Sequence, residues 1–178
     1  MNKITLGDRC FELFIPHSEI DKAIAEVAQA INREYENNCL MLLITLNGAI
    51  VFAADLLKQL TVDCRISCIK LSSYSGTECT HTIKDLIGLT EDLTNQRVLI
   101  IEDIVDTGNT YAYIVDILKN QNVKDIKIAT MIFKPDAYKH SLPVHFVGLP
   151  IPDKFIVGRG LDYNGTGRNL IDIYQVCE

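Results

Sequence analysis

The sequence predicts an α/β fold in which helices flank a twisted, mostly parallel sheet. Two observations support this prediction: unbroken apolar runs of strand length, and segments of helical periodicity between them. Residues 40–46 (LMLLITL) are the clearest apolar run, and residues 49–60 follow with helical spacing after Asn47-Gly48. A strand that is apolar throughout is typical of a sheet covered on both faces. Strands that alternate with helices favour parallel pairing.

The other predicted elements continue this alternation. Ser18-Glu19-Ile20-Asp21 resembles a capping box, and apolar residues then recur on one helical face, so a helix is predicted to run to about Tyr35. Further strands are predicted at residues 66–71, 98–101 and 126–133, with a helix near residues 111–119.

Two segments break the pattern. Residues 72–82 (SSYSGTECTHT) are polar and small without periodicity, which fits either a solvated loop or a lid over an active site. After Phe133, the short runs VHFVGL, FIV and LIDIYQV are interrupted by prolines and glycines. These runs predict a small irregular cap instead of another strand–helix repeat.

Size and composition favour one ordinary globular domain. The chain has 178 residues, 48% of them hydrophobic and 22% charged. No window approaches the roughly 18 apolar residues of a membrane span, and the first ten residues lack the apolar region of a signal peptide. We therefore expect a cytoplasmic protein that does not contact membranes. A formal net charge of −6 also argues against nucleic acid as the main partner.

The cysteines predict neither disulfides nor a zinc site. They are irregularly spaced, and Cys64 and Cys68 lack a second pair or a histidine cluster to complete a metal site. We interpret them as reduced thiols, as is usual in the cytoplasm. The six positions are Cys10, Cys39, Cys64, Cys68, Cys79 and Cys177.

The stretch from Leu99 to Thr110 (LIIEDIVDTGNT) contains the strongest functional signal. An apolar strand ends in Glu102 and Asp103, Asp106 follows shortly after, and a small polar tetrad leads into a helix. Ligands of open α/β sheets bind beyond the carboxyl ends of the strands, where we expect these acids to lie. Amide hydrogens, a glycine and hydroxyls at a helix start can cradle a phosphate. A helix cap with a few solvated acids is the alternative.

The acids and the phosphate cradle are compatible if the ligand is a phosphorylated sugar. Carboxylates accept hydrogen bonds from ribose hydroxyls, and Mg²⁺ compensates additional negative charge. The sequence therefore predicts adjacent subsites for the hydroxyls and the phosphate.

With these residues the chain resembles the type I phosphoribosyltransferases, whose phosphoribosyl diphosphate motif matches LIIEDIVDTGNT. Residues 46–48 (LNG), 133–136 (FKPD) and 151–170 (IPDKFIVGRGLDYNGTGRNL) narrow the resemblance to the hypoxanthine-guanine branch. The resemblance extends from Leu40 to the C-terminus. It implies a core of about residues 36–135, a small hood from about 1–17 and 143–178, and a mobile lid over about 72–82.

The resemblance implies a reaction in which a 6-oxopurine nitrogen displaces pyrophosphate from phosphoribosyl diphosphate. Asp106 matches the general base that takes the proton of the purine's imidazole nitrogen. Glu102 and Asp103 would hold the ribose hydroxyls, directly or through Mg²⁺. The residues that would bind the 5′-phosphate, next to Asp106, are Thr107, Gly108, Asn109 and Thr110.

The same resemblance assigns the base pocket. Lys134 matches the residue that reaches the exocyclic oxygen of the purine, which would exclude adenine; a lysine at a strand end is the alternative. Phe155 would stack on the base, unless it is a core aromatic, with the backbone near Ile156 and with Asp162 reading the far edge. Asp162 also matches a ligand of a second Mg²⁺.

The remaining implied residues surround the pyrophosphate and close the site. Arg168 would grip the pyrophosphate with its guanidinium, although an arginine in a glycine-flanked loop is often a surface residue. Backbone amides of Leu46, Asn47 and Gly48 would face the same group, with a cis peptide bond that does not involve proline. Ser73 and Tyr74 match the closing lid, which would exclude water. Members of the family usually form homodimers or homotetramers.

Three positions depart from the commoner pattern of the family. Asn47 and Asn109 stand where many relatives carry lysine, so affinity for phosphoribosyl diphosphate would depend more on Mg²⁺. Arg159 replaces a frequent aromatic, which leaves subunit contacts and base preference open.

Two other classes of function compete with this interpretation. A regulator that binds nucleotides and RNA is disfavoured by the acidic net charge and by the complete set of matching residues. A dinucleotide-dependent reductase is disfavoured because no G-x-G-x-x-G follows the first strand of the predicted core.

Overall fold

The computed structural model describes residues 3–73, 83–87, 89 and 91–177. The core is a six-stranded sheet in the order β5-β4-β3-β6-β7-β8, in which five strands are parallel and β5 is antiparallel to β4. Its strands are β3 (Leu40–Leu46), β4 (Cys64–Ser73), β5 (Ile83–Ile87), β6 (Arg97–Val105), β7 (Asp125–Phe133) and β8 (Phe146–Pro150). This arrangement confirms the predicted α/β class.

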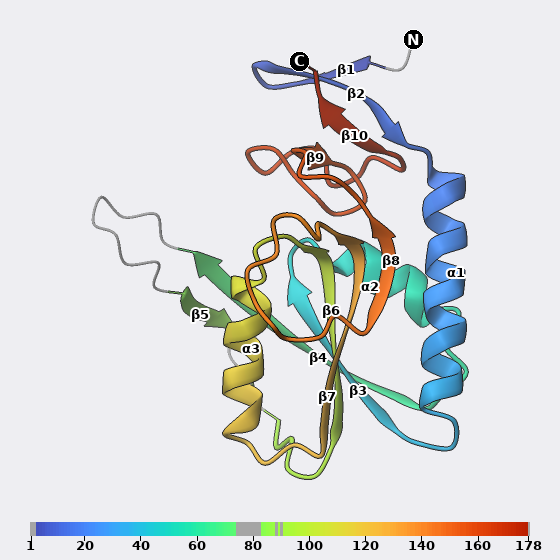
Figure 1. Cartoon of the computed structure of the whole chain (residues 1–178), viewed down its shortest axis with the longest axis vertical. Helices are drawn as coiled ribbons and strands as arrows, with labels where there is room; N and C mark the ends of the chain where they lie inside the picture. The colour runs from blue at the N-terminus through green and yellow to red at the C-terminus, as the bar shows by residue number, and fades with distance from the viewer. Residues whose placement is uncertain (1–2, 74–82, 88, 90, 178) are drawn as a thin grey trace.

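Helices cover both faces of the core sheet (Figure 1). On one face, α1 (His17–Glu34) and α2 (Ile50–Leu57) pack against a cluster that includes Leu42, Leu99 and Met131. On the other face, α3 (Asn109–Lys119) packs on a cluster that includes Leu43, Ile100 and Ile128. Because both faces are covered, the central strands are apolar throughout. None of the described helices is both long and apolar enough to span a membrane.

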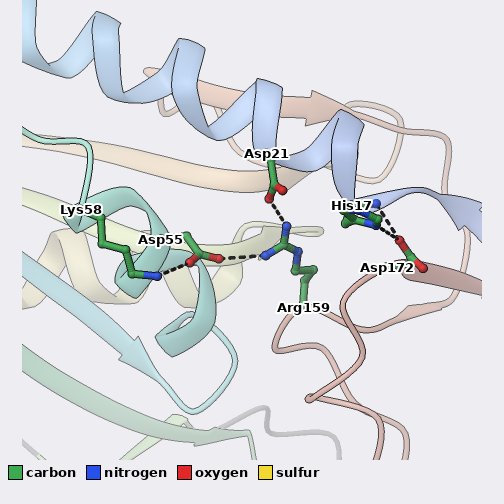
Figure 2. Close-up of polar contacts among 6 residues, drawn as sticks. All are labelled: His17, Asp21, Asp55, Lys58, Arg159 and Asp172. Atoms are coloured by element: carbon green, nitrogen blue, oxygen red, sulfur yellow. Dashed lines mark hydrogen bonds and ion pairs between the residues drawn. The ribbon is translucent and has the colours of Figure 1, made fainter.

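The capping box predicted at Ser18 is wrong. Helix α1 begins at His17 with Pro16 as its N-cap, and no side chain of the N-cap residue closes it. Instead, Asp172 Oδ1 accepts hydrogen bonds from the His17 backbone N–H at 2.7 Å and from Nδ1 at 2.9 Å (Figure 2). An acid 155 residues away in sequence therefore supplies the capping oxygen.

A second, antiparallel sheet lies at the upper end of the molecule in Figure 1, where the two ends of the chain meet. Its strand order is β1-β2-β10-β9, and we call it the hood sheet. The strands are β1 (Lys3–Leu6), β2 (Arg9–Ile15), β9 (Ile156–Val157) and β10 (Ile173–Val176). The five described cysteines are free thiols; two of them, Cys10 and Cys177, bring their Sγ atoms to 2.7 Å at the edge of this sheet.

Two boundaries differ from the sequence prediction. The run VHFVGL does not belong to the cap, because β8 pairs in parallel with β7 from Ala129↔Phe146 to Phe133↔Pro150 and completes the core sheet. Its position at the sheet edge explains why it is short and ends in a proline. At the other edge of the sheet, β5 is a strand that the sequence analysis did not predict. It follows residues 74–82, which make up most of the predicted lid and lie outside the described residues.

Candidate active site

Strands β3, β6 and β7 end at the same edge of the core sheet, and the predicted site residues gather there. Strand β6 continues to Val105, because Ile104 and Val105 keep pairing with β7. The prediction that Glu102 and Asp103 lie beyond the strand end was therefore wrong: both are in β6, and only Asp106 follows it. Backbone pairing does not depend on side-chain charge, so the β-branched residues after the acids extend the strand.

A cavity of about 300 Å³ opens at this edge. It is lined by the ends of β3 and β6 and by the start of α3, so it brings Glu102, Asp103 and Asp106 together with the predicted phosphate cradle. The lining residues of the cradle are Thr107, Gly108, Asn109 and Thr110.

The cradle has the geometry of an anion site. Gly108 is the N-cap of α3 and adopts φ +84°, and its carbonyl accepts the first helical hydrogen bond from Ala112 at 2.9 Å. A Cβ at Gly108 would lie 2.3 Å from the ring of Tyr138, so the position requires glycine. No side chain of the N-cap occupies the amides of the first turn. These amides are the donors that bind phosphate at helix N-termini.

The two acids of β6 lie in the cavity wall, where Glu102 is buried and Asp103 is partly exposed. Glu102 is 5% exposed, and its Oε1 has no hydrogen-bond partner among the described residues. Burial and, after it, the neighbouring charge of Asp103 raise the pKa of Glu102 well above its usual value. Burial also raises the pKa of Asp103 to about 6. Buried carboxylates that repel each other are stabilised by a cation or by hydroxyl donors, so the pair suits a sugar–metal ligand.

The raised pKa of Asp103 predicts how stability depends on pH. Between about pH 4 and 6 the folded state keeps a proton that the unfolded state has lost, so the free energy of unfolding should fall as pH rises through this range. Asp103→Asn should weaken this dependence, as measured by urea unfolding of the ligand-free protein from pH 4 to 8. Asp116→Asn, an exposed acid on α3, is the matched control and should behave like the wild type. Equal pH slopes for Asp103→Asn and the wild type would contradict the assignment.

A second cavity of about 300 Å³ adjoins the first, and the two share Asp103, Ile104 and Asp106. Its other lining residues are Lys134, Phe155, Ile156, Leu161 and Asp162. The structure thus groups all the residues predicted to bind the base around one space that opens onto Asp106.

Lys134 lines this second cavity and is buried and paired. Its Nζ donates to Asp106 Oδ2 at 2.8 Å and to Asp153 Oδ1 at 3.0 Å. Burial alone would lower the pKa of Lys134, but these hydrogen bonds outweigh it and raise the pKa. Sequence reasoning missed Asp153, because an exposed acid in a Pro-Asp-Lys turn gives no signal of its partner.

Phe155 forms an accessible wall of the second cavity. It is 45% exposed, so it is not a core aromatic. Phe11 and Tyr163 support it from the hood sheet and its loop, with ring centroids 6.3 and 6.0 Å from that of Phe155. An aromatic ring that is packed on one side and free on the other is suited to stack on a planar ligand.

The segments predicted to bind pyrophosphate meet between the core and the hood. The peptide bond Leu46–Asn47 is cis, as the resemblance implied. Arg168 Nη1 donates to Gly160 O at 2.6 Å, and its Nη2 pairs with Asp162 Oδ1 at 2.6 Å. The second oxygen of Asp162 accepts from the Gly165 backbone N–H at 2.7 Å, so both oxygens are occupied.

Two predicted roles have less geometric support. Among the described residues, no group of three His, Cys, Asp or Glu side chains is arranged to hold a metal ion, so Glu102, Asp103 and Asp162 do not form one cluster. Ser73 is the last residue of β4, and Tyr74 lies outside the described residues. The side chain of Asn109, at a position where many relatives carry lysine, pairs with His140 Nε2 at 2.9 Å.

Comparisons with known proteins agree with this geometry. The family model described as a phosphoribosyl transferase domain matches residues 16–164. Hypoxanthine phosphoribosyltransferase of Escherichia coli (strain K12) is 38% identical over 168 residues, covering 93% of this chain and 94% of that protein. Hypoxanthine-guanine phosphoribosyltransferase of Bacillus subtilis (strain 168) is 34% identical over 160 residues, covering 89% of each.

The three-dimensional comparison gives the same result. A crystal structure of a hypoxanthine-guanine phosphoribosyltransferase from Bacillus anthracis matches with a TM-score of 0.88 and 34% identity, covering 93% of this chain and 98% of that chain. With the matched domain and these relatives, the chain belongs to the phosphoribosyltransferase family.

Proposed function

We propose that the protein is a purine salvage enzyme that transfers the 5-phosphoribosyl group from phosphoribosyl diphosphate to hypoxanthine or guanine, giving IMP or GMP and pyrophosphate. The observation that carries the proposal is the junction of the two cavities at Asp106, where a phosphate cradle and an aromatic-walled pocket open on one carboxylate. The names of the relatives from Escherichia coli and Bacillus subtilis support the choice of bases.

The residues divide the substrates between the two cavities. The amides and hydroxyls of residues 107–110 bind the 5′-phosphate, and the carboxylates of Glu102 and Asp103 accept hydrogen bonds from the ribose hydroxyls. The base stacks on Phe155, with Ile156 and Asp162 along its far edge. Because the cavities share Asp103 and Asp106, the anomeric carbon and the attacking nitrogen meet there.

Asp106 takes the proton of the attacking nitrogen. The glycosidic C–N bond forms as the bond between the anomeric carbon and the pyrophosphate oxygen breaks, and the nitrogen's proton passes to the carboxylate. Lys134 already donates to Asp106, so its ammonium lies close to both the base and the carboxylate. A fixed cation at the exocyclic position favours a 6-oxo over a 6-amino purine, because it donates hydrogen bonds and accepts none.

The donor set of the first cavity fits Mg²⁺. Glu102 and Asp103 are hard oxygen donors, Glu102 Oε1 is buried without a partner among the described residues, and the pKa of each carboxyl is raised. Mg²⁺ typically uses one or two carboxylates together with substrate oxygens. When bound, the ion would neutralise charge on the departing pyrophosphate. Asp162, paired with Arg168, would have to exchange partners to hold a second ion.

Assembly, location and closure are further parts of the proposal. We propose a homodimer or homotetramer, the assembly that the family resemblance implies, with the exposed Ile50, Ile66 and Ile171 as candidate contact residues. Free cysteines support a cytoplasmic protein. We also propose that residues 72–82, including Ser73 and Tyr74, act as the lid and that the hood completes the base pocket.

A spectrophotometric assay tests the function. Hypoxanthine, guanine, xanthine and adenine are each incubated with phosphoribosyl diphosphate, with and without Mg²⁺. We expect turnover of the 6-oxopurines hypoxanthine and guanine in the presence of Mg²⁺ and little with adenine. Retention on RNA at physiological salt without pyrophosphate release would support a nucleotide-sensing regulator instead.

A further inference from the structure

Arg159 points into the molecule and joins the hood to two core helices. Its side chain is 11% exposed, and Nη1 donates to Asp55 Oδ2 on α2 at 2.8 Å while Nη2 pairs with Asp21 on α1 (Figure 2). Asp55 also pairs with Lys58 at 2.8 Å. The sequence left subunit contacts open at this position, but the guanidinium is used within the chain.

The two aspartates supply the side-chain hydrogen-bond partners of the Arg159 guanidinium. Its buried Nε has no hydrogen-bond partner among the described residues, so only the terminal nitrogens are satisfied by carboxylates. Truncating Arg159 removes both ion pairs at once, although Asp55 keeps its pair with Lys58 and the side chain of Asp21 stays exposed to solvent. The arrangement also uses the planar fork, because each terminal nitrogen of Arg159 faces a different carboxylate, whereas a lysine would offer a single nitrogen on a longer, more flexible stem.

The backbone of Arg159 forms part of a tight turn, residues 158–161, that we call the hood turn. Gly158 and Leu161 exchange two backbone hydrogen bonds of 3.0 Å, and the Arg159 N–H donates to Leu170 O at 2.9 Å. Arg159 has φ +51°, a conformation that side-chain-bearing residues rarely adopt. The backbone hydrogen bonds of the hood turn and the ion pairs of the side chain together hold Arg159 in this conformation.

The hood turn presses directly on the loop of residues 46–48. A Cβ at Gly160 would lie 2.0 Å from Gly48 O, and a Cβ at Gly48 would lie 1.7 Å from Asp103 Oδ2. Bare backbone therefore runs from the hood turn through Gly48 to the acid of β6, with no flexible side chain between them. The carbonyl of Gly160 also accepts the hydrogen bond from Arg168.

We infer that Arg159 is a positioning residue for the pyrophosphate subsite. The inference rests on the proposed function, which assigns pyrophosphate to residues 46–48 and Arg168. Arg159 is anchored to α2, the helix that begins directly after this loop, so it fixes the hood turn relative to Gly48. The same anchor holds the Gly160 carbonyl that orients Arg168.

The ion pairs of Arg159 lie apart from the phosphate cradle and from the base pocket. The phosphate cradle is at the start of α3, and the base pocket is built around Lys134 and Phe155. The ion pairs of Arg159 touch neither, and of the hood turn only Leu161 lines the base pocket. Loss of Arg159 should therefore weaken ligands that contain pyrophosphate and spare the product nucleotide.

The test compares Arg159→Met with the wild type in both directions of the reaction. We expect the KM for phosphoribosyl diphosphate and, in the reverse reaction, for pyrophosphate to rise about tenfold, which corresponds to about 1.4 kcal/mol. The change in kcat should be smaller, and the Kd of IMP should stay within about twofold, a difference of about 0.4 kcal/mol. Arg159→Lys, which keeps the charge, should show an intermediate rise in the KM for pyrophosphate.

Asp172→Ala is the matched control. It removes a second polar link between the hood and α1, the pair Asp172–His17, and leaves Asp55 and α2 in place (Figure 2). The charge of Asp172 also interacts with Arg159, so this variant tests whether loss of a charge near the guanidinium is enough to change the KM values. It should lower the thermal unfolding midpoint but leave both KM values unchanged. An equal rise in the pyrophosphate KM for Asp172→Ala, or an equal loss of IMP affinity in Arg159→Met, would reduce Arg159 to a structural role and overturn the inference.

Further outcomes keep the two proposals distinguishable. If Arg159→Met does not fold, Arg159→Lys and Asp55→Asn decide, and unchanged pyrophosphate KM values in both contradict the inference. Activity of the wild type together with unchanged kinetics of Arg159→Met overturns the inference alone. Absence of transfer by the wild type with every purine base overturns the proposed function and the inference with it.

Discussion

Asp106→Asn should lower kcat by about 10²- to 10⁴-fold, the range that general base catalysis typically contributes. In the wild type, Lys134 Nζ donates to Asp106 Oδ2 at 2.8 Å. The asparagine oxygen can still accept this hydrogen bond, but it cannot take a proton from the base. Shape and most contacts are retained, so the Kd of IMP should change little. Steady-state turnover and calorimetric IMP titration measure the two quantities separately.

The control for this variant is Asp116→Asn, an exposed acid on the outer side of α3. It carries the same chemical change far from both cavities and should keep wild-type turnover. If Asp106→Asn also kept full turnover, another group would have to serve as the base.

Lys134→Met should cause the second largest loss, a fall of about 10²-fold or more in kcat/KM for hypoxanthine, because truncating a buried charged donor typically costs 2–5 kcal/mol. Lys134 is 5% exposed, and its hydrogen bonds to Asp106 and Asp153 raise its pKa, so the ammonium stays charged throughout a neutral assay. Methionine fills similar space without donating. The preference for hypoxanthine over adenine should therefore shrink as well.

Competition assays with the two bases measure this preference directly. Lys124→Met, at an exposed lysine beside the start of β7, is the control at the opposite edge of the sheet and should not alter it. An unchanged ratio of kcat/KM values in Lys134→Met would show that another group selects the 6-oxo position.

The sequence predicted the core best where a short segment is apolar at every position. Residues 40–46 were predicted as a strand and form β3, because a fully apolar run of this length fits only the middle of a covered sheet. The predicted strand at residues 98–101 was shorter than β6, because two adjacent acids, Glu102 and Asp103, are typical of a strand end. In the structure, Ile104 and Val105 continue the pairing with β7. Strand β8 was missed, because an edge strand buries less and carries a proline.

The candidate site shows the same division between local and distant signals. Residues 102–110 are contiguous, so their pattern alone brings the acids and the cradle to one cavity. The partners of Lys134 and Arg159 come from elsewhere: Asp153 is 19 residues from Lys134, and Asp55 and Asp21 are 104 and 138 residues from Arg159. No periodicity or spacing links such residues, so only the folded chain reveals these pairs.

The hood sheet pairs strands from opposite ends of the described chain. Strand β10, made of residues 173–176, lies between β2 and β9, so these two strands are joined through a strand that follows all the other described strands in the sequence. The core sheet ends at Pro150 and can form earlier, while closing the hood brings together residues more than 150 positions apart. A growing polypeptide can thus form its phosphate cradle before the hood that completes the proposed base pocket.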